Sequence, residues 1–147
     1  MAIKVIFFDL GETLVTKPRK WLPGAKVLLQ SLRQKGFRLG IISNTEGLTT
    51  RAEILKLLPV DFDLAVFDED MMLFSSEVGK AKPQKEIFEE AVGRAHQLAS
   101  QCLFCSEDIV DTLMAQHVGM RSIRVQVAPN NDLDILEEEI LKFQALT

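Results

Sequence analysis

An apolar run that ends in a carboxylate is the feature that most restricts how this chain can fold. Residues Ile3–Phe8 are almost entirely apolar, Asp9 follows directly, and Gly11 stands two residues further on. Such a run predicts a strand buried on both faces, with Asp9 at its C-terminal end and a backbone turn at Gly11. Open α/β sheets bind ligands at that edge, although Asp9 taken alone could equally cap the next turn.

Similar apolar runs recur and alternate with helical patterns. Strands are predicted at Ile3–Phe8, Arg38–Ser43, Leu64–Phe67, Cys102–Cys105 and Ser122–Val127, and Met71–Phe74 has the composition of a further short strand. Helices are predicted at Ala25–Lys35, Leu48–Leu58, Pro83–Leu98, Ile109–His117 and Asp132–Phe143. Strands that alternate with helices predict an α/β fold, in which a mostly parallel five-stranded sheet carries helices on both faces.

Length and charge narrow the class of protein. A chain of 147 residues is expected to form one domain. The net charge is −4 and no run of Lys or Arg stands out, which argues against nucleic-acid binding. No apolar run approaches the roughly 20 residues that span a bilayer. The N-terminal sequence has no pattern of a signal peptide, so we expect a cytoplasmic protein.

The two cysteines have the spacing of a redox pair but not the expected context. Cys102 and Cys105 fall in a predicted strand, where side chains three residues apart face opposite sides. A redox pair normally opens a helix, whose dipole lowers a thiol pKa. We therefore expect two buried structural thiols.

Polar and charged side chains follow the apolar runs in an order that suits phosphoryl transfer. They are Asp9, Ser43, Asn44, Lys82, Glu107, Asp108 and Asp111. Together they offer a nucleophile, hydroxyl and amide donors, a cation and a carboxylate cluster suited to Mg²⁺. Lys80 is an alternative to Lys82, but the adjacent Pro83 favours Lys82. Asp108 could cap the helix predicted at Ile109 as readily as bind metal.

These motifs resemble the haloacid dehalogenase-like hydrolase superfamily over Ile3 to about Val127. Members carry Asp-x-Asp-x-Thr, then a Ser or Thr, then Gly-x-x-Lys-Pro, then acidic residues, which here fall on Asp9, Thr13, Ser43, Lys82, Glu107 and Asp111. The resemblance implies a Rossmann-like three-layer sandwich with the Asp9 strand at its centre. It also implies Mg²⁺ held by Asp9, the Gly11 carbonyl and an acid of the last motif. Asn44 joins Thr13, Ser43 and Lys82 as expected substrate-binding residues.

Three departures from the family pattern stand out. Gly11 replaces the second Asp, the usual general acid, and such a loss typically lowers rates about 10²–10⁴-fold. Glu12, one residue on, is the candidate substitute, although adjacent side chains on an extended turn point apart. Glu107 replaces an Asp and Ser106 a common Gly. No stretch is long enough for a lid, so residues 1–147 are expected to form a single core domain without a cap, with an open site.

The sequence therefore predicts a Mg²⁺-dependent phosphomonoester hydrolase that acts through an aspartyl-phosphate. Its substrate would be a phosphorylated small molecule or a macromolecular phosphoester. The alternative is a degenerate relative that binds a phosphorylated ligand or a protein partner without turnover. Carbon–halogen hydrolysis is a third, disfavoured option, because those relatives generally use a capped, metal-independent pocket. The oligomeric state is not predictable from these features.

Overall fold

The fold is a three-layer α/β sandwich in a computed structural model that describes residues 2–45, 47–126 and 133–145. The central sheet has the order β5-β4-β1-β6-β7, and all its pairings are parallel. Its strands are β1 (Val5–Phe8), β4 (Arg38–Ser43), β5 (Met72–Phe74), β6 (Cys102–Ser106) and β7 (Arg121–Arg124). The predicted five-stranded parallel sheet with the Asp9 strand at its centre is confirmed.

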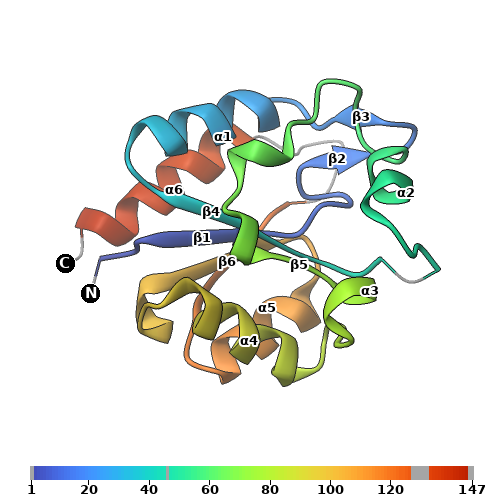
Figure 1. The fold of residues 1–147 in the computed structure, drawn as a ribbon. Coiled ribbons are helices and arrows are strands. Elements are labelled where there is room, and N and C mark those ends of the chain that lie inside the picture. The colour runs from blue at the N-terminus through green and yellow to red at the C-terminus, as the bar shows by residue number, and fades with distance from the viewer. Residues whose placement is uncertain (1, 46, 127–132, 146–147) are drawn as a thin grey trace.

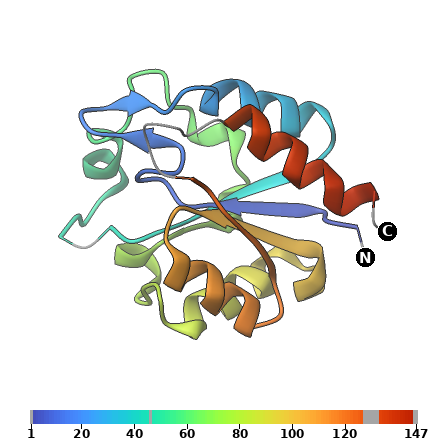
Figure 2. The same ribbon diagram turned by 180° about the vertical axis from the view of Figure 1, so that it is seen from behind.

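Helices cover both faces of the sheet (Figure 1). The two helices on one face are α1 (Ala25–Gln34) and α6 (Leu133–Ala145). Those on the other are α4 (Lys85–Ala95) and α5 (Ile109–His117), and the rear view in Figure 2 shows the same layers. The short helices α2 (Arg51–Leu55) and α3 (Ser75–Val78) lie near the carboxyl end of the sheet, together with the hairpin of β2 (Val15–Thr16) and β3 (Lys20–Trp21).

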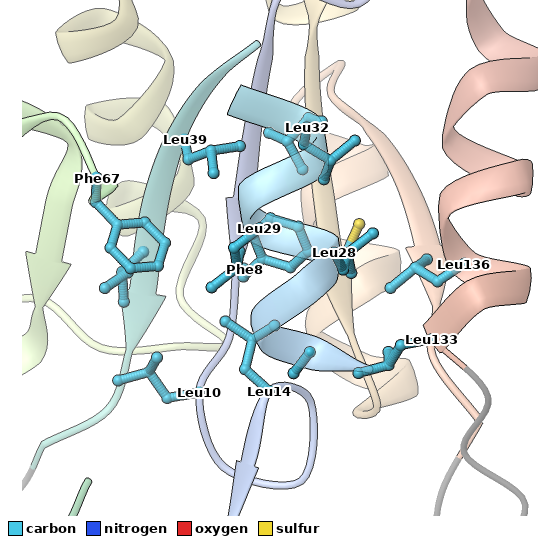
Figure 3. Close-up of a cluster of buried hydrophobic side chains, with 14 of the residues drawn as sticks. Phe8, Leu10, Leu14, Leu28, Leu29, Leu32, Leu39, Phe67, Leu133 and Leu136 are labelled. Atoms are coloured by element: carbon cyan, nitrogen blue, oxygen red, sulfur yellow. The ribbon is translucent and has the colours of Figure 1, made fainter. Parts of the chain in front are cut away.

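Alternation along the central strand divides the core in two. Ile6 and Phe8 join the apolar cluster beneath α1 and α6, whereas Val5 and Phe7 join the cluster beneath α4. Figure 3 shows the first cluster, in which Phe8 lies among leucines of α1. Because both faces of β1 are fully buried, its register is strongly specified, and a slip by one residue would exchange the two faces. Asp9 is thereby held at the carboxyl edge.

The cysteines follow the same alternation. Cys105 belongs to the cluster beneath α1, and Cys102 to the one beneath α4. Both are free and buried. Burial raises the pKa of the Cys102 thiol to about 11 and raises that of Cys105 further. The two thiols are therefore structural, as their spacing on a strand predicted.

One predicted strand is wrong. Leu64–Val66 forms a 3₁₀ turn, η1, in which the Asp63 carboxylate accepts a hydrogen bond from the Ala65 amide at 2.9 Å. The sheet's edge strand is β5 instead, within the segment that had the composition of a further strand. All three residues of β5 are buried, whereas Leu64–Val66 is half-exposed or exposed. Short apolar runs alone do not separate these cases.

Several predicted boundaries also shift. The helix expected over Leu48–Leu58 is the shorter α2, which Thr50 caps at its N-terminus. The helix expected over Pro83–Leu98 is α4, which ends where His96 adopts a left-handed conformation. Two other predicted termini, Val127 and Asp132, lie outside the described residues. In the described part of the chain, helices fall short of the length and apolar character that a membrane crossing demands.

The β2–β3 hairpin is fixed to the body of the protein at two points. The Trp21 ring stacks on Phe62 with centroids 4.9 Å apart, and its indole N–H donates to Asp61 at 2.8 Å. Arg19 Nε donates to the carbonyl oxygen of Leu58 at 2.8 Å. Trp21 thus packs a loop, and the hairpin is a well-anchored projection beside the carboxyl edge of the sheet (Figure 1).

Candidate active site

A buried ion-pair triad occupies the carboxyl edge of the sheet. Lys82 Nζ lies 2.9 Å from Asp9 Oδ1 and 3.2 Å from Asp111 Oδ2. The Lys82 side chain is only 3% exposed, and its ammonium lies 5.7 Å from the centroid of the Phe104 ring. Lys80 instead pairs with Glu90 on α4. The structure therefore places Lys82 beside the predicted nucleophile.

The Asp9 carboxylate is held in one orientation. Its Oδ1 accepts from the Leu10 amide at 2.8 Å in addition to contacting Lys82. Its Oδ2 has a longer contact, 3.3 Å, with the hydroxyl of Ser106. The two oxygens are thus unequally engaged, and Oδ2 is the more available for a substrate or a cation.

Asn44 contacts the backbone of Lys82. Its Nδ2 donates to the Lys82 carbonyl at 3.0 Å, and its Oδ1 accepts from the Lys82 amide at 2.9 Å. Both polar groups of the Asn44 side chain thereby hold the residue whose ammonium reaches Asp9. Asn44 was predicted to bind substrate, and that stays a prediction; in this structure its side chain contacts the Lys82 backbone.

Ser43, at the end of β4, differs from its neighbour. The residue is 6% exposed, and across the described residues its hydroxyl has no hydrogen-bond partner. β4 pairs with β1 with Phe8 opposite Ile41, so Ser43 ends its strand beside the Asp9 turn. A buried hydroxyl without a protein partner is uncommon and is suited to a bound ligand.

Thr13 and Ser106 organise the acidic end of the site. Thr13 is fully buried, and its hydroxyl accepts from the Glu107 amide at 3.1 Å, so it positions that loop. Ser106 is also fully buried, and its hydroxyl accepts from the Asp108 amide at 3.1 Å while it contacts Asp9. Sequence reasoning noted Ser106 only as a departure from a common Gly. Its place at the end of β6, two residues before Asp108, is the signal that could have found it.

Repulsion among carboxylates marks this end of the site. The pKa of Glu107 is raised, first by burial and then by the charges of Asp108, Asp9 and Glu12. The pKa of Asp111 is also raised by burial, although Lys82 opposes the shift. A site that raises carboxyl pKa values in this way favours a cation, which would offset the mutual repulsion.

The first turn leaves room beside Gly11. The residue is exposed, its φ is not positive, and a Cβ placed there would meet no atom within 4 Å. Glu12 adopts φ 59°, and its Oε1 accepts a hydrogen bond from the Thr16 hydroxyl at 2.7 Å. The Glu12 carboxylate is thus oriented toward the hairpin while its charge still acts on Glu107.

The donor set fits Mg²⁺ in part. Asp9 and Glu107 supply carboxylate oxygens, and in the described chain the Gly11 carbonyl accepts no hydrogen bond. Asp108 Oδ1 instead caps α5, accepting from the amides of Val110 and Asp111. The described residues hold no ready-made group of three or more acidic, His or Cys ligands. Mg²⁺ commonly uses one or two carboxylates and keeps several waters, so Asp9 and Glu107 remain candidate ligands.

A nucleophile-like aspartate, a bridging lysine and an acidic loop at the carboxyl edge of a parallel sheet define an α/β protein with a site of hydrolase type. The profile of the haloacid dehalogenase-like hydrolase family matches residues 10–119. The chain belongs to this family.

Curated relatives include two phosphatases. The chain is 31% identical to a glyceraldehyde 3-phosphate phosphatase of Pyrococcus abyssi, over 69% of this chain and 41% of the relative. It is 28% identical to a ribulose-1,5-bisphosphate 5-phosphatase of Halopiger xanaduensis, over 76% of this chain and 44% of that one. The chain thus matches less than half the length of these relatives.

Solved structures share the fold at lower identity. One is a family enzyme of Bacteroides thetaiotaomicron in complex with magnesium and inorganic phosphate, with a TM-score of 0.71 and 17% identity. The match covers 92% of this chain and 99% of that one. At this identity the likeness concerns the fold, and it extends over nearly the whole of both chains.

Proposed function

We propose that this chain hydrolyses phosphomonoesters, with Asp9 as the nucleophile and Mg²⁺ as the cofactor. The observation that carries the proposal is the contact of one buried ammonium, on Lys82, with both Asp9 and Asp111. Membership of the hydrolase family and similarity to two phosphatases support it. So does the Ser43 hydroxyl at the same edge, for which the described residues provide no hydrogen-bond partner.

The reaction would proceed in two displacements. An Asp9 oxygen forms a bond to phosphorus while the ester P–O bond breaks, and the leaving alkoxide takes a proton from an acid. Water then attacks phosphorus of the aspartyl-phosphate, loses a proton to a base, and releases orthophosphate and the Asp9 carboxylate. Lys82 and the Ser43 hydroxyl would stabilise charge on the phosphoryl oxygens.

Glu107 is the best candidate for the second metal-binding carboxylate. Asp111 is engaged by Lys82 and Asp108 caps α5, whereas no described residue donates a hydrogen bond to the Glu107 side chain. Asp9, the Gly11 carbonyl and Glu107 would hold Mg²⁺, which supplies charge neutralisation when phosphorus is attacked.

The proton donor is the open part of this mechanism, because Gly11 carries no side chain. Glu12 is the nearest carboxyl group of the first motif. Its contact with Thr16 orients it toward the hairpin, and rotation about its side-chain bonds would have to bring it toward the free space beside Gly11. If no group supplies this proton, the chain is a binding protein that retains the phosphate site without efficient turnover.

The test is a panel of phosphomonoesters assayed with and without Mg²⁺, beside Asp9→Asn. We expect hydrolysis that requires Mg²⁺ and is lost in Asp9→Asn, because an amide is a poor nucleophile. Turnover at the parent rate in that variant would place the chemistry elsewhere. Binding of phosphate without hydrolysis of any ester would favour the alternative, a relative that binds phosphorylated ligands without turnover.

A further inference from the structure

The tip of the β2–β3 hairpin is strongly basic. Lys17, Arg19 and Lys20 are all exposed and fall within four consecutive residues of a chain whose net charge is −4. In the part of the chain that the structure describes, neither Lys17 nor Lys20 makes an ion pair or a hydrogen bond through its side chain. Arg19 Nε contacts a neutral carbonyl, so its charge is not offset either.

This basic tip lies close to the acidic end of the site. Thr16 pairs with Lys20 across the hairpin, and the Thr16 hydroxyl donates to Glu12. Paired strand residues have Cα atoms about 5 Å apart, so the Lys20 side chain begins close to Thr16, which is hydrogen-bonded to Glu12 of the first motif. Glu12 itself acts electrostatically on Glu107. The hairpin thus borders the first motif directly: Val15 of β2 also bridges Gly11, and Lys20 lies across from Thr16.

The hairpin presents these charges from a fixed position. Trp21 is stacked and hydrogen-bonded at the base, and Arg19 is bonded to the Leu58 carbonyl at the tip. A preorganised recognition element loses little conformational entropy on binding. The space beside Gly11, where a Cβ would meet nothing, opens from the nucleophile's turn in the same segment.

We infer that the hairpin selects phosphomonoesters whose leaving group carries a second anionic group, a carboxylate or a further phosphate, and that Lys17 and Lys20 bind it. This inference rests on the proposed function. The phosphoryl group is held at Asp9, Ser43 and Lys82, and the leaving group extends past Gly11 toward the hairpin. Two unpaired lysines match one additional anion, and are too few for a nucleic-acid backbone, which presents many phosphates.

The test compares esters that differ only in the second charge. One pair is 3-phosphoglycerate and glycerol 3-phosphate, which differ in a carboxylate. The other is propane-1,3-diyl bisphosphate and 3-hydroxypropyl phosphate, which differ in a phosphate. We expect the parent to favour the anionic member of at least one pair in kcat/KM, and the responding pair identifies the anion. Lys17→Gln with Lys20→Gln should reduce that ratio by roughly tenfold, at a few-fold for each exposed ion pair.

A matched control separates local recognition from net charge. Lys4→Gln with Lys142→Gln makes the same change in charge on two exposed lysines, on the N-terminal side of β1 and on α6. The control should retain the parent ratio. A parent without preference, a preference that survives in Lys17→Gln with Lys20→Gln, or an equal loss in the control would each overturn the inference.

A binding measurement keeps the two proposals distinguishable. If no ester is hydrolysed, the proposed function fails, and calorimetric titration with 3-phosphoglycerate and glycerol 3-phosphate then tests the hairpin alone. Tighter binding of 3-phosphoglycerate that is lost in Lys17→Gln with Lys20→Gln would uphold recognition of the anion without catalysis. Equal affinities, measured also for the bisphosphate pair, would refute it.

Discussion

The side-chain amide of Asn44 forms two hydrogen bonds with the backbone of Lys82, at 3.0 Å and 2.9 Å. The two residues lie 38 positions apart in the sequence. This contact fixes the loop before α4 to the end of β4, and so sets where the Lys82 ammonium meets Asp9. Asn44 thus holds the Lys82 backbone, and we expect it to position the Lys82 ammonium.

Replacement of Asn44 by Ala should therefore weaken catalysis through Lys82. The loss of two hydrogen bonds leaves backbone groups unpaired, and we expect kcat to fall roughly 10- to 100-fold with a smaller change in KM. Steady-state kinetics on the best ester of the panel would measure the changes in kcat and KM separately. A purely structural role predicts instead a lower melting temperature with kcat unchanged at a temperature where the variant is folded.

Replacement of Lys82 by Met should destabilise the metal-free protein. Removal of one partner from a buried ion-pair group leaves uncompensated charges, which typically lowers stability by about 3–5 kcal/mol. Combination with Asp111→Asn should recover part of this loss, because one of the two stranded carboxylates is removed. Urea unfolding of the single and double variants measures the change in the free energy of unfolding. Additive effects of the two substitutions would contradict an ion-pair triad that Lys82 and Asp111 share.

Glu107→Gln should separate stability from metal binding. The Glu107 pKa is raised in the folded protein, so its carboxyl favours folding most when protonated, and that contribution is lost as the pH rises through the folded pKa. Without Mg²⁺ at pH 7, Glu107→Gln should therefore raise the melting temperature, and the gain should shrink toward pH 4. The rise that Mg²⁺ produces in the parent should disappear in the variant.

The variant's response to Mg²⁺ decides whether Glu107 is a ligand. Asp108→Asn is the matched control, since Asp108 caps α5 and lies in the same acidic loop. An Mg²⁺-induced shift that survives in Glu107→Gln but vanishes in Asp108→Asn would transfer the metal-binding role to Asp108.

Gly11→Asp should restore a general acid without distorting the turn. A Cβ at Gly11 meets no atom within 4 Å and its φ is not positive, so the strain that a left-handed glycine would impose is absent. We expect hydrolysis of alkyl phosphates to increase by about 10²-fold, and of activated aryl phosphates by less, because aryl leaving groups need little protonation. A folded variant without gain beside an inactive parent would favour the binding-only alternative.

Glu12→Gln provides the complementary result. If Glu12 has taken over proton transfer, this variant should lose activity on alkyl phosphates and retain more on aryl phosphates. Thr16→Val removes the hydroxyl that holds Glu12 toward the hairpin, and a change in activity on alkyl phosphates that aryl phosphates do not share would support that assignment. Unchanged kinetics in Glu12→Gln would show that another group supplies the proton.

Much of the fold was predictable because buried strands leave a strong sequence signal. Ile3–Phe8 and Cys102–Cys105 were predicted as strands, and both lie at the centre of the sheet. At the edge the signal failed, because Leu64–Val66 is as apolar as β5. The Asx contact of Asp63 and the burial of β5 decide between them, and neither follows from local composition.

The site was predictable in its residues rather than in its contacts. Asp9 and Lys82 were predicted to converge, and the structure brings them to 2.9 Å. The contacts of Thr13 and Asn44 with backbone amides depend on how loops from distant segments meet. The role of Ser106 depends on the same packing. Motif spacing carries no information on such long-range geometry.

Gly40 controls how closely β4 lies against β1. Gly40 pairs with Phe7 in the sheet, and a Cβ there would lie 2.6 Å from the Phe7 ring and 2.7 Å from the Met71 carbonyl oxygen. The carbonyl belongs to backbone and cannot rotate away. Gly40→Ala must therefore displace β4 or the Phe7 ring, and overpacking of this kind typically destabilises by about 1–3 kcal/mol or more.

Gly93→Ala is the matched control for Gly40→Ala, because the chemical change is identical. Gly93 is exposed within α4, and a Cβ there meets nothing within 4 Å. Gly93→Ala should stabilise the protein by roughly 0.5–1 kcal/mol, since alanine favours the helix. Urea unfolding with a constant m-value would measure both effects.

Because Gly40 lies three residues before Ser43, Gly40→Ala should also lower kcat at temperatures where the variant remains folded, whereas Gly93→Ala should not. Equal stability of the two variants would show that β4 adapts to the added methyl group, and that the position of Ser43 does not depend on close packing at Gly40.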